Sequence, residues 1–368
     1  MYLSGLPQMV TEFGTTEAVL NMSLYMFMLS FTISILFLGP LSDKYGRRKT
    51  LIISMIIYTA SCFLCCLSVN VEMFIALRII EAIGAGGAIS VAFALVKDCF
   101  SGREMAGILS LVAVLGILGP ILSPVIGTVL INFINWKATF WAPAVISALC
   151  IVLGSMLPGD IPLERMQGSV KDAVGLVFKL MKERNFFDFT MMLTSFSASQ
   201  LGFIAVSSYV FLQDYGLDRT QYSLALAASC VMGLILAEVL KRIKMKSNTV
   251  VLVMFLLSAL SMVMMFTMPR FGWVWFMLAI VPNCAACTIT RSFGFNILMN
   301  NHEGDNGAVS SLLNCMTFLY AFIGMAVASS FPSNMFTYAV AIVMLAMTAV
   351  YGICWFDLKR QKPLKGLE

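Results

Sequence analysis

Long apolar runs alternate with short polar segments along almost the whole chain. A helix needs about 20 apolar residues to cross roughly 30 Å of hydrocarbon, and runs of this length are typical of transmembrane helices. The pattern predicts eleven complete spans, near residues 20–41, 51–69, 73–97, 104–131, 138–157, 186–211, 220–240, 249–268, 272–298, 306–328 and 334–356. We therefore expect an all-α polytopic membrane protein.

The composition agrees with this pattern and excludes several other classes. With 60% hydrophobic and 12% charged residues, the 368-residue chain is too apolar to cover itself with a polar surface. The ten cysteines lie mostly inside the apolar runs, as soft packing residues do. Cys284 and Cys287 form a CxxC, but no second ligand pair accompanies them and the single histidine is His302. We expect no metal site and no cofactor.

The positions of the basic residues predict the orientation of the helices. Most of the 24 Lys and Arg residues fall in alternate gaps between the apolar runs, including the gap at 42–50 and the C-terminal tail. Because basic loops stay on the cytoplasmic side, these gaps and the C-terminus are predicted to be cytoplasmic.

The first residues resemble the end of a helix that has lost its beginning. If 42–50 is cytoplasmic, the polar segment TEFGTTE at 11–17 is external, and MYLSGLPQMV before it is too short to span. We expect residues upstream of Met1 to complete a first helix. Twelve spans would then form two six-helix halves, an organisation typical of transporters.

This organisation predicts four segments. They are an N-terminal half with a partial first helix and five spans (1–157), a cytoplasmic linker (158–185), a C-terminal six-helix half (186–356) and a cytoplasmic tail (357–368). The linker holds a Ser-x-x-Asp cap pattern and an apolar face, which favour an interfacial helix, although a solvated linker fits equally well.

The stretch GPLSDKYGRRKT at 39–50 concentrates charge between two spans. A basic loop that only fixes the orientation of the helices in the membrane would explain this stretch. However, Gly39 and Gly46 also allow two helices to approach closely, and Asp43 is an acid that such a loop does not need. An acid there can accept hydrogen bonds from the N-terminal amides of another helix, so a packed, charged joint is the second interpretation.

Three stretches resemble motifs of the major facilitator superfamily. GPLSDKYGRRKT is similar to the G-x-x-x-D-x-x-G-R-K/R loop between its second and third helices, LRIIEAIGAGGA at 77–88 to its fourth-helix motif, and GILGPILSPVIG at 116–127 to its fifth-helix antiporter motif. The segments YLSGLP, SVAFALVKD and INFINWKATFW resemble Bcr/CflA-type drug:proton antiporters.

This resemblance implies a function. It implies the major facilitator fold and proton-coupled efflux of lipophilic or amphipathic antimicrobials such as chloramphenicol, by alternating access in a bacterial inner membrane. The implied partners are small lipophilic drugs, protons and the lipid bilayer, with no nucleic acid, and the protein would be a monomer driven by the proton gradient. In similar proteins an acid precedes the MYL-like residues, a position that lies upstream of Met1 here.

The resemblance also suggests a conformational latch. Its residues are Gly39, Asp43, Gly46, Arg47, Arg48 and Asp98. Asp43 is expected to cap a helix of the opposite half that starts near residues 304–307, while Arg47 pairs with Asp98 at the end of the fourth helix. Asp305 at that helix start would compete with Asp43.

Arg78 and Glu81 are the candidates for proton coupling. A charge inside a span costs at least about 2.5–3.5 kcal/mol on insertion scales and is normally retained for function. Glu81 lies one helical turn from Arg78, so a static ion pair that serves packing is the alternative. Glu238 and Lys241 are expected to form a surface pair.

The fifth-helix stretch is expected to bend and to pack closely. Its small and helix-breaking residues are Gly116, Gly119, Pro120, Pro124 and Gly127. The resemblance suggests a dry seam between the halves that limits proton leak, against the alternative of an ordinary kinked span. Ser123-Pro124 departs from the residues that many similar proteins have there.

Candidate cavity residues follow from position. They are Tyr25, Gln200, Phe203, Asn283 and Arg291. Spans rich in Met, Phe and Tyr suit large apolar solutes, because soft side chains repack around different shapes. A sugar or amino-acid transporter would be expected to carry more polar spans, and a membrane-embedded enzyme would need a nucleophile with a base, which the spans lack.

Overall fold

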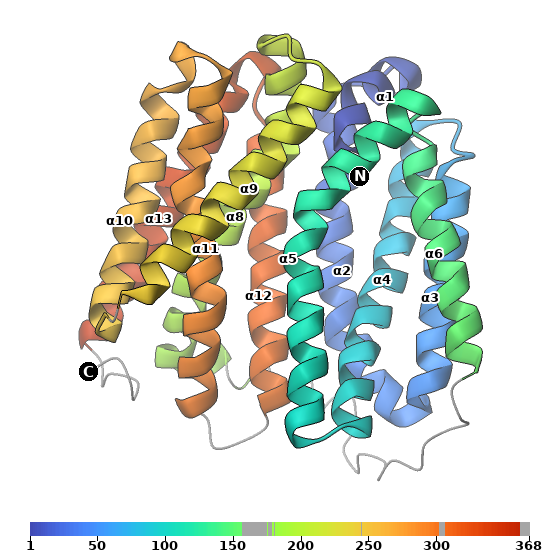
Figure 1. Ribbon diagram of the computed structural model, residues 1–368, viewed down its shortest axis with the longest axis horizontal. Helices are drawn as coiled ribbons and strands as arrows, with labels where there is room; N and C mark the ends of the chain where they lie inside the picture. The colour runs from blue at the N-terminus through green and yellow to red at the C-terminus, as the bar shows by residue number, and fades with distance from the viewer. Residues whose placement is uncertain (157–174, 176–178, 180, 244, 302–305, 361–368) are drawn as a thin grey trace. The chain divides into compact units, whose positions relative to one another are not determined.

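A computed structural model describes residues 1–156, 175, 179, 181–243, 245–301 and 306–360. The described chain is helical and contains no strand, so the predicted all-α class is confirmed (Figure 1). Its residues divide into two compact units, Met1–Gly175 (unit 1) and Leu176–Glu368 (unit 2). The predicted linker at 158–185 lies mostly outside the described residues, as does most of the tail at 357–368.

The described residues of unit 1 form a short 3₁₀ turn and six helices. They are η1 (Tyr2–Gly5), α1 (Leu6–Phe13), α2 (Glu17–Tyr45), α3 (Arg47–Cys65), α4 (Val71–Cys99), α5 (Gly102–Phe133) and α6 (Ala138–Ser155).

Where unit 2 is described, it contains six long helices and three short ones. They are α8 (Arg184–Tyr209), the π-helix η2 (Val210–Asp214), α9 (Arg219–Arg242), α10 (Ser247–Thr267), η3 (Pro269–Phe271), α11 (Trp273–Asn301), α12 (Asn306–Ser329), η4 (Ser333–Met335) and α13 (Phe336–Arg360).

The long helices follow the predicted spans. Within the described residues, ten helices are long and apolar enough to cross a membrane. The remaining predicted span, 104–131, coincides with α5, whose described apolar part, Leu118–Phe133, is shorter. The helices extend past the apolar runs because polar residues add their end turns. At the start of α4, for example, the Asn70 side chain accepts a hydrogen bond from the Met73 amide at 2.8 Å.

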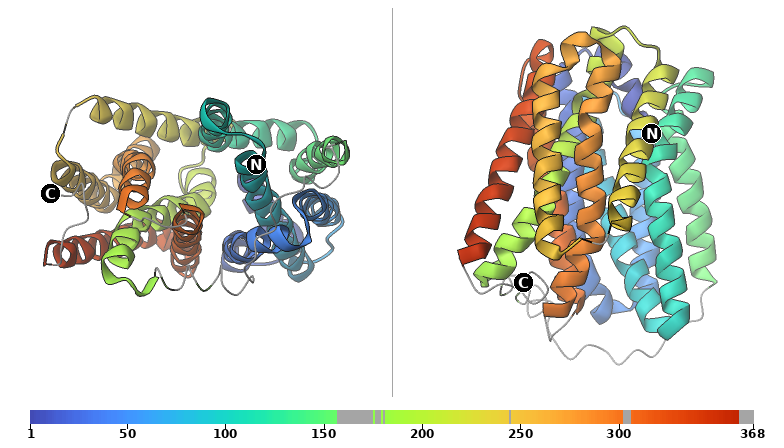
Figure 2. Two further views of the ribbon diagram at one scale, coloured as in Figure 1. Left: turned by 90° about the horizontal axis from the view of Figure 1, so that it is seen from below. Right: turned by 60° about the vertical axis from the view of Figure 1, so that its left-hand side comes forward.

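In unit 1, α4 packs against both α2 and α3, and α3 packs against α6 (Figures 1 and 2). The glycines of α4 allow the close approach. A Cβ on Gly84 would lie 2.6 Å from the Tyr58 amide nitrogen of α3, and one on Gly86 would lie 2.8 Å from Ser34 Cβ of α2. Small residues at these contacts let helix backbones meet, as in other membrane bundles.

In unit 2, α8 packs against α11, α12 and α13 (Figure 2). A Cβ on Gly324 of α12 would overlap the backbone of Ala198, so these two helices also meet at backbone distance. The apolar windows of α8 and α11 are 78% and 72% buried, against 28–44% for the other spans of this unit. Helices α8 and α11 therefore form the interior of unit 2.

Candidate functional site

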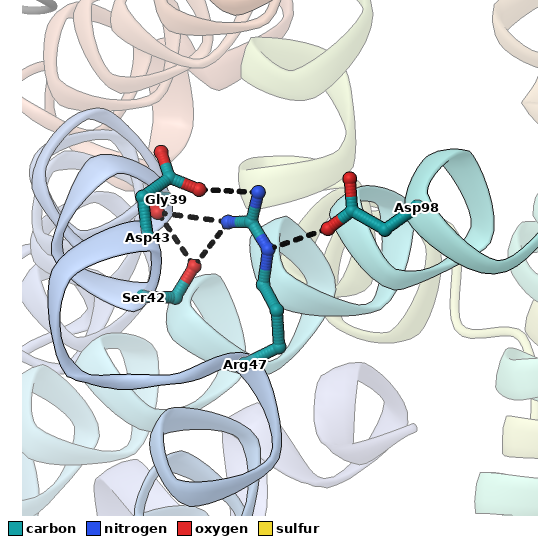
Figure 3. A network of polar contacts seen from close by, with 5 residues as sticks. All are labelled: Gly39, Ser42, Asp43, Arg47 and Asp98. Carbon is teal, nitrogen blue, oxygen red and sulfur yellow. Dashed lines mark hydrogen bonds and ion pairs between the residues drawn. The ribbon is translucent and has the colours of Figure 1, made fainter. Parts of the chain in front are cut away.

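The guanidinium of Arg47 joins three helices at one end of unit 1 (Figure 3). Its Nε lies 2.8 Å from Asp98 Oδ2 at the end of α4, and its Nη2 forms an ion pair with Asp43 of α2. Its Nη1 donates to Ser42 Oγ at 2.6 Å and to the Gly39 carbonyl at 3.4 Å. The contact expected between Arg47 and Asp98 is present, and Asp43 shares the same cation.

The two glycines of this loop have different structural roles. Gly46 joins α2 to α3 with φ of 101°, a conformation that side chains disfavour. A Cβ on Gly39 would lie 2.7 Å from Ser90 Oγ of α4, so Gly39 allows α2 to approach α4. The motif thus packs α2 against α4 and turns the chain into α3.

Arg48 has a contact that the sequence did not indicate. Its Nη2 donates to the Ser155 carbonyl at the end of α6. A cation at a helix C-terminus pairs favourably with the exposed carbonyls and the helix dipole. Arg48 therefore ties α3 to α6. The helix start near 304–307 that Asp43 was expected to cap lies partly outside the described residues, together with Asp305, and the latch stays a prediction.

Arg78 and Glu81 form a buried ion pair inside α4. Arg78 Nη1 lies 2.7 Å from Glu81 Oε2, and the two residues are 7% and 4% exposed. The Arg78 Nε is also buried and has no hydrogen-bond partner among the described residues. A charge pair in this setting is sensitive to the loss of either partner, because the other charge stays buried without compensation.

Aromatic rings enclose the Arg78 side chain. Its Cζ lies 4.1 Å from the ring centroid of Phe27, 5.0 Å from that of Tyr2 and 5.7 Å from that of Phe140. These distances are within the range of cation–π attraction. The rings come from α2, η1 and α6, so residues far apart in the sequence stabilise the buried cation.

The carboxylate of Glu81 has a second neighbour on α3. Cys65 Sγ lies 3.8 Å from Glu81 Oε2, close enough for a weak S–H donation. Glu81 thus receives donors from α3 and α4. This surrounding fits either role predicted for the pair, a proton-responsive switch or a static packing element.

The α5 glycines differ in their surroundings. A Cβ on Gly127 would overlap the Met1 carbonyl, so this glycine seats η1 against α5 inside unit 1. A Cβ on Gly116 or Gly119 meets no described atom within 4 Å. The helix continues through Pro120 and Pro124. The predicted seam between halves stays a prediction.

The cavity candidates of unit 2 occupy α8 and α11. Asn283 is 1% exposed, and its Nδ2 donates to the Phe196 carbonyl of α8 at 3.3 Å. Gln200 is half-buried, with its Nε2 3.8 Å from Cys284 Sγ. Phe203 packs against Phe276 with ring centroids 5.0 Å apart. Asn283 and Gln200 therefore lie at one α8–α11 contact.

The other candidates lie elsewhere. Tyr25 is half-buried on α2 in unit 1. Arg291 belongs to α11, and its side chain lies outside the described residues. Near the end of α9, Lys241 Nζ lies 2.9 Å from Glu238 Oε1, as expected of a surface pair.

Comparison with known sequences finds transporters. The chain is 25% identical over 342 residues to the multidrug resistance protein MdtL of Shewanella sp. (strain ANA-3), covering 88% of this chain and 83% of that protein. It is 27% identical over 228 residues to the uncharacterized MFS-type transporter YdgK of Bacillus subtilis (strain 168), covering 61% of this chain. The chain spans 57% of YdgK and 59% of MdtL from Klebsiella pneumoniae (strain 342). The resemblance to drug transporters noted in the sequence segments is confirmed by these MdtL relatives.

Solved structures share the fold. The D-xylose-proton symporter superposes with a TM-score of 0.76 at 14% identity, covering 99% of this chain and 94% of that one. The nucleoside transporter NupG superposes with a TM-score of 0.72 at 14% identity, covering 96% and 93%. The family model described as Major Facilitator Superfamily matches residues 1–325. The chain therefore belongs to the Major Facilitator Superfamily.

Proposed function

We propose that this protein exports lipophilic or amphipathic antimicrobials, such as chloramphenicol, in exchange for protons. The observation that carries the proposal is the Arg78–Glu81 pair buried inside a membrane-spanning helix. Ionisable residues are costly within a span and mark ion or substrate pathways. The name of the MdtL relatives, multidrug resistance protein, supports drugs as the transported class.

In the proposed mechanism, the ion pair responds to protonation of a carboxylate. Protonating Glu81 removes its attraction for Arg78, which stays charged within its aromatic surroundings. The loss of that attraction changes the relative energies of the inward-facing and outward-facing states, so proton binding and drug release are coupled.

The Arg47 cluster is the proposed latch of the same cycle. Its bonds to Asp43 and Asp98 hold the ends of α2, α3 and α4 together as one rigid corner. A rigid corner lets a half of a transporter move as a body when access alternates. We place this corner on the cytoplasmic side of a bacterial inner membrane, because its loop is basic.

The test uses everted membrane vesicles that contain the protein and have an acidic lumen. Adding chloramphenicol should release protons from the lumen, which a pH-sensitive dye reports as alkalinisation. Vesicles with Glu81→Gln should give no drug-dependent signal. Vesicles with Glu238→Gln are the matched control, because Glu238 forms a surface pair and should leave the signal intact.

The same vesicles separate the alternative of a proton-coupled metabolite transporter. Sugars and amino acids added in place of the drug should give no alkalinisation. A response to these solutes, together with silence across a broad drug panel, would replace the drug proposal with a metabolite transporter.

A further inference from the structure

Most hydroxyls buried in α8 donate within their own helix, whereas those of Ser199 and Ser208 have no partner among the described residues. The Thr190 hydroxyl donates to the Phe186 carbonyl at 2.8 Å, and the Ser195 hydroxyl donates to the Met192 carbonyl at 2.9 Å. Hydroxyls in a helix can donate to the carbonyl three or four residues earlier without any external group. These side chains therefore need no ligand.

Asn283 differs, because its side-chain carbonyl is only an acceptor. Its Nδ2 is used by the Phe196 carbonyl, which must face a donor, so the orientation of the amide is determined. Its Oδ1 is buried and receives no hydrogen bond from any described residue. A buried acceptor without a donor is costly and rare in native interiors. A donor from outside the protein can therefore stabilise this oxygen.

The surroundings of Asn283 add a second amide and a proline within the continuous helix α11. Gln200 lies at the same α8–α11 contact, with its amide nitrogen turned toward Cys284 Sγ. Pro282 lies inside α11 and provides no amide hydrogen for the Leu278 carbonyl one turn earlier. A proline inside a helix thus leaves one carbonyl of the preceding turn without its usual helical donor.

The charges of these two helices exclude one class of ligand. The stretch of α8 and η2 from 189 to 213 carries no charged residue, and α11 carries only one, the cation Arg291. In the other unit, Glu81 is already paired with Arg78. A lipophilic cation at the α8–α11 contact would lose its hydration without gaining a carboxylate.

We infer that Asn283 and Gln200 accept hydrogen bonds from the substrate, and that the α8–α11 contact selects uncharged molecules with N–H or O–H donors over lipophilic cations. This inference rests on the proposed function, because it names the class of drug. Asn283 determines the selectivity because its oxygen has no other donor. The Oδ1 atom is covered in this conformation, so substrate binding requires side chains at the α8–α11 contact to rearrange.

Equilibrium binding to purified protein in detergent tests the inference without requiring transport. The probes are radiolabelled chloramphenicol, which is uncharged and has O–H and N–H donors, and tetraphenylphosphonium, a cation without donors. The native protein should bind chloramphenicol in preference to the cation. Asn283→Leu should weaken chloramphenicol binding about tenfold, the effect of one buried hydrogen bond.

Asn283→Asp gives the sharper result, because it replaces the amide with a carboxylate of the same shape. It should bind tetraphenylphosphonium more tightly than the native protein does. Asn248→Asp, at an exposed position near the start of α10, adds the same charge and should change neither affinity. If Asn283→Leu does not fold, as judged by size-exclusion chromatography, Gln200→Leu tests the same contact and should weaken chloramphenicol binding.

Several outcomes overturn the inference. They are equal binding of both probes by the native protein, unchanged chloramphenicol binding in Asn283→Leu, and no binding of either probe. Selective binding that Asn283 controls, without any drug-dependent alkalinisation in vesicles, would support the inference and reject proton exchange. Alkalinisation that Asn283→Leu leaves intact, with unchanged binding, would keep the proposed function and reject this site.

Discussion

The interiors of the two units bury polar groups of different kinds. Unit 1 places the Arg78–Glu81 ion pair inside α4 and surrounds the cation with aromatic rings. The interior of unit 2 holds hydroxyls and the amides of Gln200 and Asn283, and its described ion pairs lie at the ends of helices. A charge pair changes its energy when a proton binds, whereas amides discriminate by hydrogen bonding. The difference supports proton coupling in one unit and substrate selection in the other.

The largest expected effect comes from breaking the ion pair of unit 1. Arg78→Gln leaves Glu81 buried without its cation and should lower the free energy of unfolding by about 3–5 kcal/mol. Removing both charges, in Arg78→Leu with Glu81→Leu, should restore most of this loss while abolishing drug-dependent alkalinisation. Denaturant unfolding in detergent and the vesicle assay measure the two effects. Equal destabilisation by the single and double variants would contradict a dominant role for charge.

A second prediction concerns close backbone contacts between helices, which occur inside each of the two units. Gly324→Ala should force α8 and α12 apart in unit 2, and Gly84→Ala should do the same to α3 and α4 in unit 1, each at about 1–3 kcal/mol. Gly116→Ala, where a Cβ meets no described atom, is the control and should be nearly neutral. Thermal unfolding compares the three. A large loss in only one unit would show that the two differ in packing as well as in charge.

A third prediction compares the Arg47 cluster at the end of unit 1 with the buried Arg78–Glu81 pair. Asp43→Asn or Asp98→Asn removes one of two acidic partners of Arg47, so stability should fall by about 1 kcal/mol or less. Transport should nevertheless fall several-fold, with little change in membrane insertion, if the corner acts as a latch. Drug efflux is normalised to the amount of inserted protein. Unchanged efflux in both variants would reject the latch.

The smallest effect on transport is expected from the neutral contacts of unit 2. Ser258 and Thr348 share a hydrogen bond of 2.6 Å between α10 and α13, and Ser258→Ala should cost about 1 kcal/mol by leaving Thr348 without it. Adding Thr348→Val should recover part of the loss, because no polar group then stays unpaired. Unfolding of the single and double variants gives the coupling energy. A loss as large as that of Arg78→Gln would remove the energetic contrast between the units.

The sequence indicated some contacts of the candidate site and missed others. The pair of Arg47 and Asp98 was expected from the family resemblance, and that of Arg78 and Glu81 from their spacing of one helical turn. The ion pair of Asp43 with Arg47 also follows the i,i+4 spacing, but the motif directed attention to a partner on another helix. The bond from Arg48 to the Ser155 carbonyl joins residues 107 positions apart, and no local pattern indicates it.

Hydropathy and length were sufficient to predict the helices, the membrane environment and the all-α class, because a span must satisfy its own backbone and present apolar side chains to lipid. Motif spacing was sufficient to predict the family. Only the tertiary structure showed two other features. The aromatic side chains of Tyr2, Phe27 and Phe140 surround Arg78, and the side-chain oxygen of Asn283 has no described partner. Each depends on which helices become neighbours, and in a membrane that is set by packing between helices, which one-dimensional hydropathy does not encode.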